Sequence, residues 1–225
     1  MAVVNPGFLL VELPAEHADQ AQVLGEMARL VTDEGGEVLA HAPAGRVACL
    51  EPGSIGASLL IARWREPARL RAAALNALLP ALRGRLPAAA LPTVLAIEGL
   101  PERGLPEMMD VPTAASVPRP PAAPRNTFLV IRGSVWDQPR LDRYRDVILP
   151  MHKERGGLYE VFALQPGQVE ALSGTWPEQI FAISRWPHRA AAEDFWYCDR
   201  YQKTAIPLRL GAGRFTVHLV EAATL

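Results

Sequence analysis

The chain has few cysteines, no long apolar run and no excess of either charge, and each absence excludes a class of protein. Two cysteines among 225 residues, Cys49 and Cys198, argue against a disulfide framework and fit a reducing cytoplasm. No segment approaches the roughly 18 consecutive apolar residues of a membrane span. A formal net charge of −1 provides no basic surface for phosphate backbones. We therefore expect a cytoplasmic protein that binds neither membranes nor nucleic acid.

Several motifs that carry chemistry are also missing. The sequence has no zinc-type Cys/His spacing, no His-Glu-x-x-His, no phosphate-binding glycine loop and no Gly-x-Ser-x-Gly. The first residues, Met1 to Leu13, lack the basic region of a signal peptide and lead directly into strand-like sequence. We therefore predict no signal peptide, no metal site and no cofactor.

What the sequence does contain is an internal repeat. Similar segments recur at offsets that drift only from 120 to 123 residues. These segments are Phe8–Val11 with Phe128–Ile131, Gly35-Gly36 with Gly156-Gly157, Val47–Leu50 with Val169–Leu172, Ile61–Trp64 with Ile183–Trp186, and Glu98 with Glu221. A chance similarity would not hold its register so far, so the pattern indicates two diverged copies of one unit.

A proline-rich segment separates the two halves. Pro106 to Arg125 carries six prolines in twenty residues. Proline removes a backbone donor and fixes φ, so this segment is typical of an extended tether. We divide the chain into a first unit (1–105), a linker (106–125) and a second unit (126–225).

The second unit has the clearer pattern of elements. Strands are predicted at 127–135, 158–164, 180–186 and 214–220. A helix begins at the predicted N-cap Asp137 and ends at Gly156-Gly157, and a second helix begins near His188. The order β-α-β-β-α-β is that of the ferredoxin-like motif.

The first unit repeats this order. Strands are predicted at 8–13, 37–41, 57–64 and 92–97, with helices around 24–31 and 70–82. Each sheet would have helices on one face and a bare apolar face on the other, which a second copy would cover. The predicted fold class is α+β, with two tandem ferredoxin-like units that pair into an intrachain dimeric α+β barrel. We expect a monomer with internal pseudo-twofold symmetry, or a homodimer of it.

The second unit resembles a known family along almost its whole length. The residues that carry the resemblance are Tyr144, His152, Gly156-Gly157, Leu172-x-Gly174-x-Trp176-Pro177, Trp186–Ala192, Phe195-Trp196, Tyr201-Gln202, Arg209 and Val220-Glu221. Together they resemble domain of unknown function 1330, a branch of the dimeric α+β barrel superfamily. The first unit is similar to this family only through the repeat.

The sequence departs from the family pattern at several positions. Arg63 and Arg185 stand where the family usually has a glutamate, and Trp196 stands where it usually has a tyrosine. Cys198 and Ala222 replace a common serine and glycine. The resemblance implies no settled activity, since the superfamily includes cofactor-free monooxygenases, isomerases, cyclases, haem-degrading oxygenases and regulatory domains.

Two residues are candidates for catalysis. His152 lies one turn after Ile148, so it could face the layer between helix and sheet and act as a general acid or base. The alternative is that it only complements the negative end of the helix dipole. Tyr144 lies on the same helical stripe, where packing is the alternative to catalysis.

The candidate ligand-binding residues are Phe195, Trp196, Tyr201 and Arg185. The three aromatic residues could line a site for a flat apolar molecule, or they could pack an ordinary core. Arg185 could bind a carboxylate, or it could pair with a nearby Glu or Asp at the rim. An ungapped alignment of the repeat places Ala74, Leu75 and Leu79 opposite Trp196, Tyr197 and Tyr201, so such a site would exist in the second unit alone.

These residues leave two functional hypotheses open. The first is a small-molecule enzyme without cofactor that binds an apolar or aromatic substrate in the second unit, for isomerisation, cyclisation or oxygenation. The second is a non-catalytic accessory or protein-interaction module. Polar groups that converge on an enclosed cavity would favour the first hypothesis, and a closed apolar core would favour the second.

Overall fold

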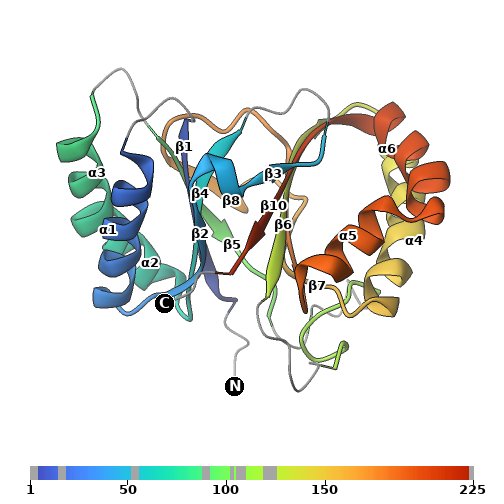
Figure 1. Cartoon of the computed structure of the whole chain (residues 1–225), viewed down its shortest axis with the longest axis horizontal. Helices are drawn as coiled ribbons and strands as arrows, with labels where there is room; N and C mark the ends of the chain where they lie inside the picture. Colours follow the sequence, from blue (N-terminus) through green and yellow to red (C-terminus); the bar gives the residue numbers. More distant parts are fainter. Residues whose placement is uncertain are drawn as a thin grey trace.

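The computed structural model describes residues 5–14, 19–51, 56–87, 92–101, 104, 110–118 and 126–222. Figure 1 shows two sheets face to face in the middle of the molecule, with helices on both outer sides. The chain therefore forms four layers, helix–sheet–sheet–helix. This is the tandem ferredoxin-like arrangement that the sequence predicts.

The described residues of the first unit form five strands and five helical segments. In chain order these are β1 (Gly7–Pro14), α1 (Gln20–Asp33), β2 (Glu37–Ala42), the short turn η1 (Ala44–Arg46), β3 (Ala48–Cys49), β4 (Ala57–Trp64), α2 (Pro67–Ala73), the π-helix η2 (Ala74–Leu78), α3 (Leu79–Arg85) and β5 (Thr93–Glu98). The predicted strands and helices are confirmed here, with the addition of β3.

The second unit has the same order of elements. These are β6 (Thr127–Val135), α4 (Gln138–Glu154), β7 (Leu158–Ala163), β8 (Val169–Ser173), β9 (Ile180–Trp186), α5 (Arg189–Tyr197), the π-helix η4 (Tyr201–Ala205), α6 (Ile206–Ala212) and β10 (Gly213–Glu221). Asp137 caps α4 as predicted, because its carboxylate accepts from the Arg140 amide at 3.0 Å. Helix α4 ends before Gly156, whose φ of 72° suits glycine.

The two sheets exchange an edge strand. One sheet has the order β2-β4-β1-β5-β8 and the other the order β3-β10-β6-β9-β7. Strand β8 of the second unit therefore extends the sheet of the first, and β3 of the first unit extends the sheet of the second. The sequence predicts neither strand, because turn residues surround both and neither pairs within its own unit.

Three apolar layers hold the elements together. One lies between the first sheet and α1–α3, and another lies between the second sheet and α4–α6. The third fills the space between the two sheets and includes Phe8, Leu10, Phe128 and Val130. The apolar face of each sheet is thus covered by the other unit of the same chain, as the sequence predicts.

Part of the predicted tether packs against the second unit. Residues 110–118 form a turn in which Val111, Thr113 and Val117 are buried. The Pro112 carbonyl accepts from the Tyr159 amide of β7 at 2.8 Å. This part of the linker is therefore docked, and residues 105–109 and 119–125 lie outside the described residues. In the described part of the chain, none of the helices has the length and apolar character of a membrane span.

Candidate functional site

The aromatic segment of the second unit lies inside the outer helix layer. His188 begins α5 by accepting from the Ala191 amide through Nδ1 at 3.1 Å, as the predicted helix start requires. From this start, Phe195 and Trp196 point into the layer and are 2% and 4% exposed. Tyr201 follows on η4 and is fully buried, with its ring 4.6 Å from that of Phe195 and 4.9 Å from that of Trp196.

The π-helix η4 determines where Tyr201 and Arg209 lie. Pro207 is the second residue of α6, so it has no amide hydrogen for the usual helical bond. The π-helix η4 lies directly before this helix, and π-turns are frequent at functional sites. Helix α6 then carries Arg209 into the same layer as Tyr201.

Arg209 is the centre of a buried polar group that we call the Arg209 cluster, made of Glu51, Tyr144, Trp196, Tyr201 and Arg209. The guanidinium is fully buried and forms an ion pair with Glu51, which comes from the first unit just after β3. Nη1 donates to the Tyr201 hydroxyl at 2.9 Å, and the guanidinium carbon lies 4.8 Å from the centre of the Trp196 ring. Burial lowers the pKa of Arg209 from 12.5 to about 9, so the group is still charged at neutral pH.

The Arg209 cluster continues to a second tyrosine. The hydroxyls of Tyr201 and Tyr144 are 3.1 Å apart. Burial raises the pKa of both, which keeps both hydroxyls protonated. Because the Tyr201 hydroxyl accepts from Arg209, it can donate its own hydrogen to the Tyr144 hydroxyl. The Tyr144 hydrogen is then the last in this series of hydrogen bonds.

His152 lies on the same layer but in different surroundings. It is 1% exposed and its ring lies 4.4 to 4.8 Å from those of Phe195, Tyr159 and Trp186. Nδ1 is 2.9 Å from the Ile148 carbonyl, which can only accept, so Nδ1 carries the hydrogen and Nε2 has a lone pair. Among the described residues, Nε2 has no hydrogen-bond partner.

Burial also determines the charge state of His152. It lowers the pKa of the imidazole from 6.5 to about 4, more than the bond to the Ile148 carbonyl raises it. The ring is therefore neutral at pH 7. The predicted alternative, a charged histidine that complements the helix dipole, does not agree with this environment.

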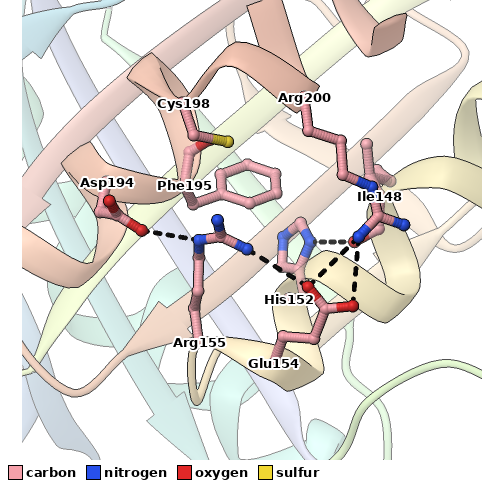
Figure 2. Close-up of polar contacts among 8 residues, drawn as sticks. All are labelled: Ile148, His152, Glu154, Arg155, Asp194, Phe195, Cys198 and Arg200. Carbon is pink, nitrogen blue, oxygen red and sulfur yellow. Dashed lines mark hydrogen bonds and ion pairs between the residues drawn. The ribbon is translucent and has the colours of Figure 1, made fainter.

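Next to His152 in the sequence, ion pairs join the end of α4 to α5 and to the start of η4. Figure 2 shows the Arg155 guanidinium between Asp194 and Glu154, with Cys198 and Phe195 on the neighbouring segment. Arg155 Nε lies 2.7 Å from an Asp194 oxygen, and Arg200 lies 3.2 Å from a Glu154 oxygen. Among the described residues, no group of three or more His, Cys, Asp and Glu side chains is placed to bind a metal ion.

Arg185 does not join these residues. It lies on β9, where residues two apart point to the same face, so it shares a face with Ile183 and Phe181. This face is directed toward the first unit. Its Nε is 3.0 Å from a Glu160 oxygen, and Arg63 of the first unit lies 3.5 Å from the other oxygen of the same carboxylate. The pairing with a nearby acidic residue is thus the arrangement observed.

The structure therefore brings some predicted residues together and separates others. Tyr144, Trp196 and Tyr201 meet in the Arg209 cluster, and Phe195 lies between this cluster and His152. Tyr144 and His152 are two helical turns apart on α4, about 12 Å along its axis. They could contact opposite ends of one molecule but not the same atom.

Two residues of the Arg209 cluster are not among the site residues predicted from the sequence. Arg209 belongs only to the family resemblance, although a single arginine in the apolar run 205–210 is a usable signal. Glu51 gave no local signal, because only the exchange of β3 between the sheets brings it to the second unit.

The first unit has apolar residues at the corresponding positions. Aligning the π-helices places Ala74 opposite Tyr201 and Leu82 opposite Arg209, and aligning the glycines that follow α1 and α4 places Val23 opposite Tyr144 and Val31 opposite His152. The ungapped alignment was therefore wrong in this region. The offset is 122 at Trp64 and Trp186 but 127 at Ala74 and Tyr201, so residues 196–200 form an insertion of five residues in the second unit.

Comparison with known proteins identifies one family. Residues 126–223 match the family described as Domain of unknown function (DUF1330). No curated protein matches the sequence.

Solved structures share the whole architecture at low identity. A protein from Fusobacterium nucleatum subsp. nucleatum, assigned provisionally as a monooxygenase, has 7% identity and a TM-score of 0.57, with 99% of this chain and 94% of that chain covered. An anthrone oxidase-like protein has 13% identity and a TM-score of 0.52, with 98% and 92% covered. A mutant chlorite dismutase from Candidatus Nitrospira defluvii has 13% identity and a TM-score of 0.51, with 100% and 93% covered.

At such identities the similarity concerns the fold alone. Residues 126–223 are therefore similar to the DUF1330 family, and the whole chain shares an α+β fold with these solved structures.

Proposed function

We propose that the second unit binds a small apolar or aromatic molecule that carries oxygen, in the layer between α4–α6 and the sheet. One observation carries this proposal. The first unit builds the same layer from Val23, Val31, Ala74 and Leu82, so the fold does not need the polar residues that the second unit has there. Burying a charge and several polar groups is costly, and such groups are typical of binding and catalytic sites.

The chemistry of the polar groups indicates what such a molecule would offer. The Tyr144 hydroxyl, backed by Tyr201 and Arg209, can donate to a carbonyl or phenol oxygen. His152 Nε2 can only accept, so it favours a hydroxyl group at the other end of the molecule. Phe195 and Trp196 supply flat apolar surface between the two.

The same groups would support a reaction without a cofactor. A neutral imidazole can take a proton from a phenol or an activated carbon, and a tyrosine hydroxyl can stabilise the oxyanion that forms. The reaction class would then be isomerisation, cyclisation or oxygenation of an enolised aromatic compound.

A ligand screen tests the proposal. Aromatic acids and polycyclic phenols of the polyketide type are screened by thermal shift, and hits are titrated by tryptophan fluorescence. Tyr144→Phe is expected to weaken a hit about 2- to 10-fold, the contribution of one hydrogen bond, and Trp196→Ala more strongly. Tyr197→Phe, at a tyrosine that is 63% exposed, is the control and leaves the affinity unchanged.

A second candidate is a non-catalytic accessory or interaction module. The tight internal pairing of Glu51, Arg209 and Tyr201 favours it, because the Arg209 guanidinium already pairs with Glu51 and donates to the Tyr201 hydroxyl within the protein. A screen without hits, or a hit that binds Tyr144→Phe and Trp196→Ala as well as it binds the wild type, would support this candidate and contradict the first.

A further inference from the structure

Two oppositely charged residues occupy the same position in the two units. In the first sheet Glu12 of β1 lies opposite Leu59 and Thr93. In the second sheet Arg132 of β6 lies opposite Phe181 and Thr216, which follow those residues by 122 and 123 positions. These are the offsets of the Trp64–Trp186 and Glu98–Glu221 pairs, so Glu12 and Arg132 are structural equivalents.

These equivalent residues also contact each other. The Arg132 guanidinium binds the Glu12 carboxylate with two hydrogen bonds, of which the one from Nη2 to Oε1 is 2.9 Å long. The two side chains are 18% and 15% exposed. Glu178 lies 3.7 Å from Arg132 Nε as a second, more distant acidic neighbour.

A position that contacts its own equivalent lies on the symmetry axis of the pairing. If two identical units paired in this way, the residue on the axis would meet a copy of itself. Two second units would bring Arg132 against Arg132, and two first units would bring Glu12 against Glu12. In a largely buried interface, such like-charge contacts disfavour the pairing strongly.

The apolar residues between the two sheets do not distinguish the two units in this way. Phe8 and Phe128 are equivalent and identical, and Leu10 and Val130 are equivalent and both apolar. An apolar surface of this kind would accept either unit as a partner. Within the layer between the sheets, the charged pair on the axis is therefore a contact that discriminates against identical units.

We propose that the Glu12–Arg132 pair makes the pairing of the two units exclusive. The sheet face of the second unit is complementary to the first unit and rejects the second unit of another copy of this chain. The pair thus acts on specificity more than on stability, because replacing a buried ion pair by apolar residues is often neutral for stability.

Refolding tests this inference on the full chain. The variant Glu12→Leu with Arg132→Leu is expected to keep its thermal midpoint within a few degrees of the wild type but to lose specificity. After refolding at raised concentration, light scattering should detect dimers and larger species for this variant and a monomer for the wild type. The control is Arg71→Leu with Glu170→Leu, which removes another ion pair between the units, one that lies away from the axis.

The possible results are distinct. A monomeric Glu12→Leu/Arg132→Leu variant, or a wild type that refolds into the same mixture, would overturn the proposal. Should the leucines prevent folding, Glu12→Gln with Arg132→Gln removes the charges with less change of shape.

Charge reversal is an independent test. Glu12→Arg alone should lower the thermal midpoint by about 10 °C, and Glu12→Arg with Arg132→Glu should recover most of this loss. A Glu12→Arg variant as stable as the wild type would also contradict the inference.

Discussion

Individual residues of the outer helix layer carry most of the difference between the two units. His152, Tyr144, Tyr201 and Arg209 stand where the first unit has valine, alanine and leucine. The corresponding positions of both units are buried, so burial at these positions does not require polar residues. Their effects on stability can be measured apart from any ligand.

His152 makes stability depend on pH. The unfolded histidine titrates near its ordinary pKa of 6.5, whereas burial lowers the pKa in the folded protein to about 4. The unfolded state therefore binds more protons between these values, so the contribution is complete above pH 6.5 and is lost as the pH falls toward 4. It amounts to about 3 kcal/mol. Denaturant unfolding at pH 7.5 and 4.5 should show this loss in the wild type, and a His152→Leu variant with the same loss would contradict the assignment.

Arg209 and Glu51 should behave as a coupled pair. Arg209→Leu leaves the Glu51 carboxylate buried without its cation and is expected to cost about 3–5 kcal/mol of unfolding free energy. Arg209→Leu with Glu51→Leu should return to within about 1 kcal/mol of the wild type, because neither charge is then buried alone. Urea denaturation measures both. Arg200→Gln, at a half-exposed pair with Glu154, is the control and should change stability by less than about 1 kcal/mol.

At the scale of elements, the two units repeat several local devices. Each has a π-helix directly before a helix whose second residue is proline, Pro80 or Pro207. Each also has a glycine after its first helix that allows a tryptophan to pack closely. A Cβ atom at Gly36 would come within 2.5 Å of Trp64, and one at Gly157 within 2.7 Å of Trp186.

Substitutions at two glycines should have opposite effects on stability, because Gly157 has a close neighbour and Gly25 has open space around it. Gly157→Ala should lower the unfolding free energy by about 1–3 kcal/mol, because Trp186 is fully buried and has no room to move. Gly25→Ala, in the middle of α1 with open space around its Cβ position, should raise it by about 0.5–1 kcal/mol through helix propensity. Thermal unfolding of both variants is the measurement. A Gly157→Ala protein as stable as the wild type would contradict the packing described for Trp186.

At the scale of the whole molecule, the two units depend on each other. Strands β3 and β8 complete the sheet of the opposite unit, and the Arg209–Glu51 pair and the Glu160–Arg63 contact cross between the units. Neither unit keeps all its contacts when the other unfolds. The division of the chain into independent domains is therefore still a prediction, which unfolding experiments can test.

This interdependence predicts a single cooperative unfolding transition. The amides of the central strands β1 and β6 should exchange with deuterium at the same free energy of opening, equal to that of global unfolding. Far-UV and near-UV circular dichroism should give the same midpoint. Two separate transitions, or faster exchange of one central strand, would show that the units unfold independently.

The sequence alone determined the order of the main helices and strands and the pairing of the two units. Strand and helix periods, the caps at Asp137 and Gly156 and the repeated Gly-Gly and Arg-Trp segments are local signals, so they can be read along the chain. The bare apolar face of each sheet also follows from the order of elements, and with it the packing of one unit on the other. The candidate site was predicted only in part, because Tyr144, Trp196 and Tyr201 are neighbours in one layer while Arg185 lies on the other face of the sheet.

Only the tertiary structure decided which polar groups meet. Glu51 reaches Arg209 because β3 crosses to the opposite sheet, and Glu12 reaches Arg132 because both lie on the axis between the sheets. Contacts of this kind join residues more than a hundred positions apart, and they depend on strand register and sheet order. No periodicity or cap encodes those two properties locally, so the buried charges of this protein become interpretable only once its strands are paired.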